Sequence, residues 1–261
     1  MRKQGLTKAD KKAARVAAEG IIIAALSADK RAAVLLEANS ETDFVARQDE
    51  FLQLATQSAE LALNAAPKSL EELLAQKLPG GDTVDERRRA MVAKIGENIP
   101  VRRFERLEAP TVIGSYVHGT RIGVLVGLEQ GDEALAREIA MHVAAMNPEF
   151  VAASDAPADL IAKEREIFLG QAQNENAALD KPKPAEIVAK MVEGRLRKRM
   201  SEMALLDQPY VKEPDITVAQ LLQRSGAKVT GFRRFEVGEG IEKKQADFAS
   251  EVEAAVRSAG K

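Results

Sequence analysis

The sequence predicts an α+β fold with two related subdomains, each a small antiparallel sheet packed with helices, plus a protruding antiparallel helical hairpin. The first observation is a pattern that occurs twice: two strand-like apolar segments, a polar loop, and an amphipathic helix that stops just before a proline. The second is a pair of long charged segments separated by prolines, which is typical of two antiparallel helices. We therefore expect a basic N-terminal helix or linker over 1–20, a first subdomain over 21–108 and a second over 109–261, with the hairpin at about 158–205.

The composition is that of a globular protein rather than a disordered one, with 45% hydrophobic and 30% charged residues in 261. A net charge of -2 provides no overall positive field for nucleic acid, although a local patch stays possible. The absence of cysteine excludes disulfides, thiol catalysis and the usual soft zinc sites. No apolar run approaches the roughly 20 residues that span a bilayer, and no apolar signal segment follows the N-terminus. We expect a cytoplasmic chain that does not enter a membrane.

The first copy of the pattern begins after a segment over 6–18 that is rich in Ala, Lys and Arg and predicts a short basic helix with a solvated face. Apolar runs at 21–26 and 32–37, joined by a turn at 27–30, predict a β-hairpin. The helix expected over about 49–64 has its apolar residues on one stripe, as a helix on a sheet requires.

Between the copies we expect short helices at 70–78 and 84–95 and a strand at 101–107 with one solvated face. The second hairpin is expected at 112–117 and 121–128. The helix after it carries His142 on its apolar stripe, which favours a hydrogen-bonded core histidine. The remaining expected elements are hairpin helices at 158–178 and 185–203, a short helix at 218–222, a strand at 229–237 that completes the second sheet, and a final helix striped by Phe248, Val252, Ala255 and Val256.

The connection from Ala38 to Gln48 is longer than its counterpart in the second copy, and the extra length contains Thr42, Asp43 and Phe44. Side chains at such strand-to-helix junctions tend to point outward. Aromatic residues make up only 4% of the chain, so an outward Phe44 would be one of few exposed aromatic anchors. Spacing alone also fits a local role, in which Thr42 or Asp43 caps the next helix and Phe44 packs back onto its own subdomain.

The residues Glu41-Thr42-Asp43-Phe44-Val45-Ala46-Arg47 resemble the signature of the bacterial elongation factor Ts family. The resemblance continues, in the family's order, through residues 92–99, 114–119, 121–126, 139–145, 187–195 and 229–242. It implies a nucleotide-exchange factor without bond-making chemistry, cofactor or metal. Such a factor binds the GTPase elongation factor Tu, destabilises its bound GDP and magnesium, and promotes GDP release during translation elongation.

The resemblance also implies which residues contact elongation factor Tu: Thr42, Asp43, Phe44, Val45, Ile95, Gly96 and His118. Phe44 would enter an apolar pocket of the GTPase domain with Asp43 beside it, displacing segments that support the magnesium and phosphate site. The residue pattern alone leaves other roles open. Ile95 is compatible with a core position, Gly96 with a helix C-cap, and His118 with a merely exposed turn.

Two further features of the family bear on this chain. Members carry a coiled-coil protrusion where the hairpin is expected. Most members begin with a three-helix module ahead of the basic helix, and that module also touches the partner. Here Met1 falls just before the basic segment, so we expect the module to be absent and binding to be weaker.

Two alternatives to the exchange factor remain on the residues alone. Arg87–Arg89 with Arg102–Arg103 form a basic patch that could bind RNA or serve another translation-associated interaction, but it has only Phe104 for base stacking and acidic neighbours, so no direct nucleic acid is expected. Glu236, Glu239 and Glu242 are a weak candidate for a hard cation. Gly238-Glu239-Gly240 lacks the context of a dinucleotide fingerprint.

Overall fold

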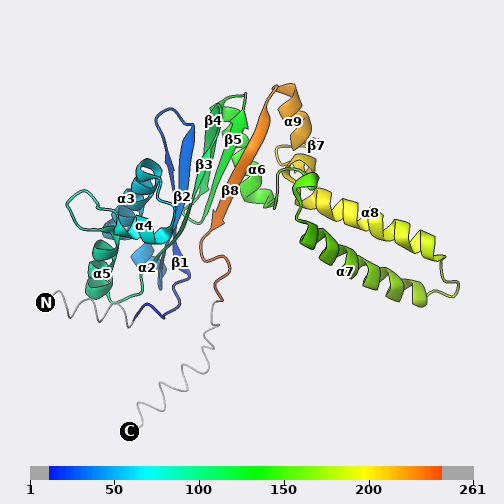
Figure 1. Cartoon of the computed structure of the whole chain (residues 1–261), viewed down its shortest axis with the longest axis horizontal. Coiled ribbons are helices and arrows are strands. Elements are labelled where there is room, and N and C mark those ends of the chain that lie inside the picture. Colours follow the sequence, from blue (N-terminus) through cyan, green and yellow to red (C-terminus); the bar gives the residue numbers. More distant parts are fainter. Residues whose placement is uncertain (1–11, 243–261) are drawn as a thin grey trace, which may run out of the picture.

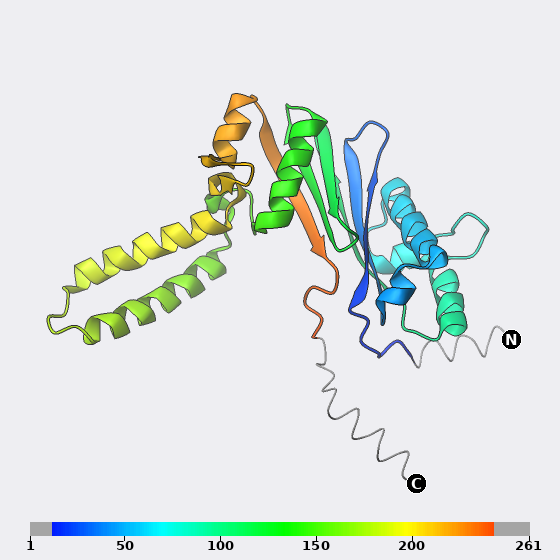
Figure 2. The ribbon, with the colours of Figure 1, turned by 180° about the vertical axis from the view of Figure 1, so that it is seen from behind.

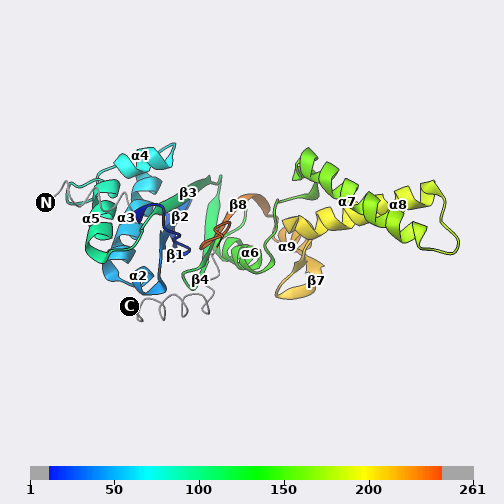
Figure 3. The same ribbon diagram turned by 90° about the horizontal axis from the view of Figure 1, so that it is seen from below.

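The computed structural model describes residues 12–242. Two three-stranded antiparallel sheets lie face to face, with helices on their outer sides, and a long helical hairpin extends away from one side (Figure 1). The view from behind and the view from below show the same layers, helix, sheet, sheet and helix (Figures 2 and 3). The predicted fold class is confirmed.

The two sheets have the same topology. The first contains β1 (Glu19–Leu26), β2 (Ala32–Ser40) and β3 (Val101–Glu108) in that order, and the second contains β4 (Val112–His118), β5 (Ile122–Glu129) and β8 (Lys228–Glu236) in that order. In each sheet a hairpin supplies the first two strands, and the third strand arrives only after the helices. Each pairing with that third strand also contains a register shift, after Glu37 in the first sheet and after Gly127 in the second.

Helices cover the outer face of each sheet. The first sheet carries α2 (Asp43–Ala46), α3 (Asp49–Ala65), α4 (Leu70–Ala75) and α5 (Val84–Ile95), and the second carries α6 (Glu133–Met146). Both α3 and α6 end in a residue with left-handed backbone, Ala66 and Asn147, directly before a proline. A proline disfavours α conformation in the residue before it, so the same local chemistry ends both helices.

The strands alternate between two cores because successive side chains point to opposite faces. Val34 and Leu36 of β2 pack toward α3, whereas Leu35 packs toward the second sheet. The core between the sheets consists of Ile22, Ala33, Leu35, Leu107, Ala109, Ile113, Leu125, Phe235 and Val237. Gly123 permits the close approach, since a Cβ there would lie 2.4 Å from Cγ2 of Ile22. The two halves therefore share one interior.

The helical hairpin is formed by α7 (Ala158–Ala177) and α8 (Ala185–Met203), as predicted, and it projects beyond the sheets (Figure 1). The base of the hairpin has a small hydrophobic core. Leu196, Met200 and Met203 pack with Phe150 and Ala204 in a buried cluster of their own. The other elements near this base are η1 (Ala153–Asp155), η2 (Leu205–Asp207), β6 (Pro209–Tyr210), β7 (Glu213–Thr217) and α9 (Val218–Arg224).

Several local expectations need correction. The predicted basic helix falls partly outside the described residues, and residues 13–18 form a turn and an irregular connection instead of helix. Asn39 and Ser40, expected in a turn, are buried in β2. The small β6–β7 sheet was not expected because its prolines are typical of a break. The final helix around Phe248 lies outside the described residues. The limits of the two subdomains stay predictions. The predicted limit after residue 108 coincides with the end of β3.

His142 confirms the expectation of a hydrogen-bonded core histidine. Its side chain is fully buried on α6, with Nε2 2.9 Å from Oε1 of Gln208 and Nδ1 3.2 Å from the backbone nitrogen of Val211. Because the Val211 N–H must donate, Nδ1 is the acceptor and the proton resides on Nε2. Burial lowers the pKa of His142, and the hydrogen bond with Gln208 only partly opposes that effect.

We expect acidification from pH 7.5 to 5.5 to destabilise the protein through His142. A histidine whose pKa is lowered by folding favours the folded state fully above its ordinary pKa of 6.5, and this advantage is lost as pH falls below 6.5, because the unfolded chain then binds the proton more readily. Urea titrations should show a slope of at most about 1.4 kcal/mol per pH unit. His142→Gln should flatten this slope. An unchanged slope in His142→Gln would contradict the assignment.

Among the helices between Lys12 and Glu242, none combines the length and the apolar character needed to cross a membrane.

Candidate functional site

Phe44 has the highest exposure of any large hydrophobic side chain in the described part of the chain, at 78%. It lies on α2, whose last two residues, Val45 and Ala46, are buried in the core of the first sheet. One side of this short helix is thus fixed in the protein while the other presents an aromatic ring to solvent. The alternative in which Phe44 packs onto its own subdomain is wrong. Val45, at 3% exposure, fixes α2 in place and offers no free contact surface.

Asp43 accompanies Phe44 on the exposed side. Its Oδ2 lies 2.8 Å from Nη2 of Arg47, one helical turn later; the Arg47 side chain is largely exposed and that of Asp43 is about half-exposed. An ion pair this exposed contributes little to stability and can open at little cost. Asp43 therefore retains a carboxylate that a partner can engage.

Thr42 occupies the N-cap position of α2, yet its side chain makes no capping bond. Its hydroxyl donates to Oε1 of Glu97 at 2.8 Å, and its backbone N–H donates to Oε2 of the same carboxylate at 3.0 Å. The expected local capping role is therefore wrong for Thr42. Glu97, which follows α5, holds the start of α2, and the Ser40 hydroxyl assists by donating to the Thr42 carbonyl at 2.7 Å.

Ile95 and Gly96 lie directly before Glu97, at the end of α5. Gly96 ends the helix in left-handed conformation, with φ of 92°, so the C-cap role is present. Ile95 is half-buried and packs partly against the core of the first sheet. Because Glu97 binds Thr42, these two residues are close to the segment that carries Phe44.

His118 is the exposed last residue of β4, directly before the turn to β5 and not within that turn as expected, and its Nδ1 lies 3.1 Å from the hydroxyl of Tyr116. The turn is bound to the start of β1, where the Ile22 N–H donates to the Thr120 carbonyl at 2.8 Å and Arg121 pairs with Glu19 at 2.7 Å. In the β1–β2 ladder Glu19 lies opposite Ser40, the last residue of β2, and residues 41–47, which we call the Phe44 segment, follow directly. All seven predicted residues therefore lie at the same end of the two sheets.

Glu37 is a functional candidate that the sequence did not indicate. Its side chain is fully buried, and its carboxylate accepts bonds from Arg102 at 3.0 Å, Arg103 at 2.6 Å and the Gly238 N–H at 2.8 Å. Burial alone would raise the pKa of Glu37, but the hydrogen bonds from Gly238, Asn39, Arg103 and Arg102 together hold it below its ordinary value. The cluster ties β2 and β3 to the chain just after β8, beside the predicted site.

The predicted basic patch is largely neutralised by such pairs. Arg88 and Arg89 both pair with Asp85, as Arg102 and Arg103 do with Glu37. In the candidate cation site, Glu239 pairs with Arg103 and Glu236 with Arg234, so these two carboxylates already have cationic partners.

Residues 41–239 match the family model for Elongation factor TS, and this match begins at the first residue of the Phe44 segment. The chain belongs to the elongation factor Ts family. It is similar to curated proteins named Elongation factor Ts from Legionella pneumophila strain Lens (54% identity over 99% of this chain and 86% of that one) and from Methylococcus capsulatus (55%, with the same coverage). The protein of that name from Xanthomonas axonopodis is 52% identical over 97% of this chain and 84% of its own. Membership of the family supports a role in translation elongation.

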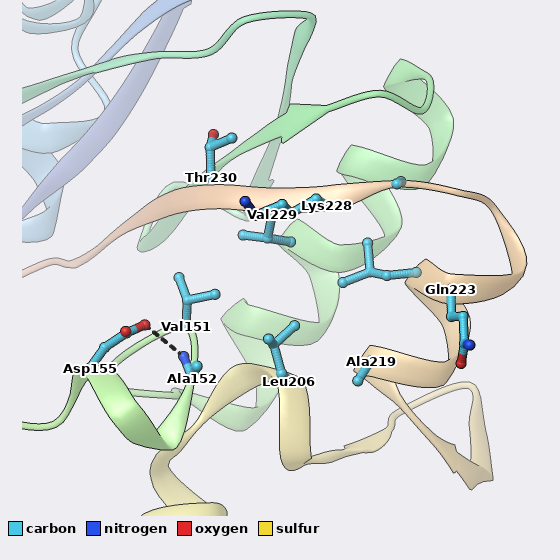
Figure 4. A pocket seen from close by; sticks show the side chains of 11 residues that line it. Val151, Ala152, Asp155, Leu206, Ala219, Gln223, Lys228, Val229 and Thr230 are labelled. Atoms are coloured by element: carbon cyan, nitrogen blue, oxygen red, sulfur yellow. Dashed lines mark hydrogen bonds between the residues drawn. The ribbon is translucent and has the colours of Figure 1, made fainter.

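The cavity in Figure 4 lies apart from the residues that the family resemblance implies. It is open to solvent, has a volume of about 450 Å³ and is lined by β8, α9, η2 and the segment that contains η1. Its lining is mainly apolar, as at Val151, Leu206 and Val229, and the nearby Asp155 carboxylate accepts a bond from the Ala152 N–H at 2.9 Å. None of the seven predicted site residues lines it.

Proposed function

We propose that the chain is a guanine-nucleotide exchange factor for elongation factor Tu. It binds the GTPase domain through the surface around Asp43 and Phe44, destabilises the bound GDP and magnesium, and promotes GDP release without making or breaking bonds. The observation that carries the proposal is the 78% exposure of Phe44 on a helix whose neighbouring residues are fixed in the core.

An exposed phenylalanine on a fixed support has the physical properties of a binding anchor. The ring has only two side-chain torsions and a large apolar area, so its burial in a partner's pocket brings a large gain for a small loss of entropy. Because aromatic residues make up only 4% of the chain, the exposure of one of them supports a role in binding.

The neighbouring residues extend the same surface. Asp43 places a carboxylate beside the ring, where it would disfavour anionic phosphate and compete for a cation nearby. Ile95, Gly96 and His118 belong to the same end of the molecule and would widen the contact around the anchor. Insertion of the ring between supports of the magnesium site would weaken GDP binding without any chemistry on the nucleotide.

The paired arginines favour this function over RNA binding. Four of the five arginines of the basic patch already have carboxylate partners, so an RNA phosphate that bound any of these four would compete with Asp85 or the buried Glu37. Displacing a buried carboxylate is costly because the charge would be left without its partners.

Reciprocal coupling provides the test of the proposed function. If the chain lowers the affinity of elongation factor Tu for GDP, GDP must lower the affinity of the two proteins by the same factor. We expect calorimetric titrations of the two proteins to show weaker binding at saturating GDP, by about five-fold or more. AMP at the same concentration serves as the control and should have no effect. Equal affinities with and without GDP would disprove the exchange mechanism.

A further inference from the structure

Glu97 and Glu41 form a crossed pair of contacts beside the Phe44 segment. The Glu97 carboxylate accepts both the N–H and the hydroxyl of Thr42, at 3.0 and 2.8 Å. In the opposite direction, Oε1 of Glu41 accepts the backbone N–H of Asn98 at 2.7 Å. We call these contacts, between residues 41–42 and 97–98, the glutamate clamp.

The clamp continues the pairing of β2 with β3 beyond the end of the ladder. The last paired residues of that ladder are Ala38 and Val101, and one more backbone bond joins the Asn39 N–H to the Pro100 carbonyl at 2.9 Å. Beyond this point the segments 41–42 and 97–98 are joined by glutamate side chains. The position of the Phe44 segment is thereby linked to the rigid sheet.

The helix that carries Phe44 needs such support. It has four residues and no side-chain cap, and a helix this short has no stability of its own in water. The buried Val45 and Ala46 fix its C-terminal half. The two residues that precede the helix, Glu41 and Thr42, are held by the clamp.

We propose that Glu97 is a positioning residue for nucleotide exchange, holding Phe44 in its binding orientation through Thr42. This inference rests on the proposed function of Phe44 and deepens it. A preorganised anchor loses less conformational freedom on binding, so its burial yields more affinity. Since Ile95 and Gly96 directly precede Glu97, the clamp also joins two contact segments that are far apart in the sequence into one surface.

The absence of tryptophan from the sequence allows a direct measurement. Phe44→Trp places a single indole at the tip of α2, and its fluorescence anisotropy reports the local mobility of that side chain in the full-length chain. We expect Glu97→Ala, added to Phe44→Trp, to lower this anisotropy. Glu97→Gln retains one accepting oxygen and should have a smaller effect. Glu108→Gln removes a negative charge at the far end of β3, away from the clamp, and should have no effect on the anisotropy.

Exchange assays test whether fixing the side chain at position 44 contributes to GDP release. With Phe44 present, Glu97→Ala should reduce kcat/KM for GDP release about ten-fold, with partial recovery in Glu97→Gln, a range found for coupled neighbouring residues. In a Phe44→Ala background the same substitution should cost less than about two-fold, because the residue that it positions is gone. Circular dichroism verifies that each variant is folded.

Unchanged anisotropy in Glu97→Ala would overturn the inference. The inference would also fail if Glu97→Ala reduced kcat/KM for GDP release equally with and without Phe44. It would fail as well if Glu97→Ala exchanged normally while Phe44→Ala was strongly impaired. Both results would leave the proposed function intact. Normal exchange by Phe44→Ala itself would instead overturn the proposed function. Anisotropy alone would then decide whether the clamp orders the segment.

Discussion

Phe44→Ala is expected to slow GDP release from elongation factor Tu on the order of thirty-fold, because loss of an aromatic hot spot commonly costs about 2 kcal/mol or more. The same substitution should change the free energy of unfolding by less than about 0.5 kcal/mol. Phe44 is 78% exposed, so its truncation creates no cavity in this protein. A large effect on exchange with a small effect on stability distinguishes a binding anchor from a core residue.

A fluorescent-GDP release assay and a urea titration on one preparation measure both quantities. Phe51→Ala is the matched control, since Phe51 lies on the buried face of α3 and is only 1% exposed. It should lose roughly 3 kcal/mol or more of stability, while exchange per folded molecule is retained. If Phe44→Ala behaved like this control, losing stability but exchanging normally, the central proposal would fail.

Glu37→Ala is expected to destabilise the protein by roughly 3 to 5 kcal/mol, the range found when one member of a buried ion pair is removed. The substitution leaves the partly buried guanidinium groups of Arg102 and Arg103 without their shared carboxylate, and the Gly238 N–H without its acceptor. Most of this loss comes from the buried donors that are left without an acceptor. The substitution should therefore lower the free energy of unfolding by more than the net stabilisation that the ion pairs themselves provide.

Chemical denaturation measures this loss, with Glu239→Ala as control. Glu239 pairs with the same Arg103 but is about half-exposed, and its removal should cost no more than about 1 kcal/mol. The pKa of Glu37 is lowered by folding, so its stabilisation is present above the ordinary pKa of 4.5 and is lost as pH falls through the folded value. A Glu37→Ala protein as stable as its Glu239→Ala counterpart would show that the cluster contributes nothing.

The elements of the fold could be predicted because each depends on local periodicity. The hairpins at β1–β2 and β4–β5, the apolar stripes of α3 and α6, and the proline that ends each helix are all visible within short windows. The outward position of Phe44 followed partly from its place between a strand and a helix, and partly from the family resemblance.

The support of the site could not be predicted in the same way. Glu37 binds Arg102 65 positions away and Gly238 201 positions away, and Glu97 binds Thr42 across 55 positions. Local sequence carries no signal for such pairs, and a charged residue at the end of an apolar run is usually solvated. Arg102 and Arg103 therefore suggested an exposed basic patch, when they are partners of a buried carboxylate.

The interior shared by the two sheets has a consequence for how the chain is made. During synthesis the first sheet, complete once β3 has left the ribosome, still exposes Ile22, Leu35 and Leu107 to water. Their cover comes from β5 and from Phe235 of β8, which lies near the end of the chain. The nascent protein thus carries an incompletely covered apolar face until β8 has left the ribosome. That face is a natural substrate for chaperones, and rapid completion of the chain protects it from aggregation.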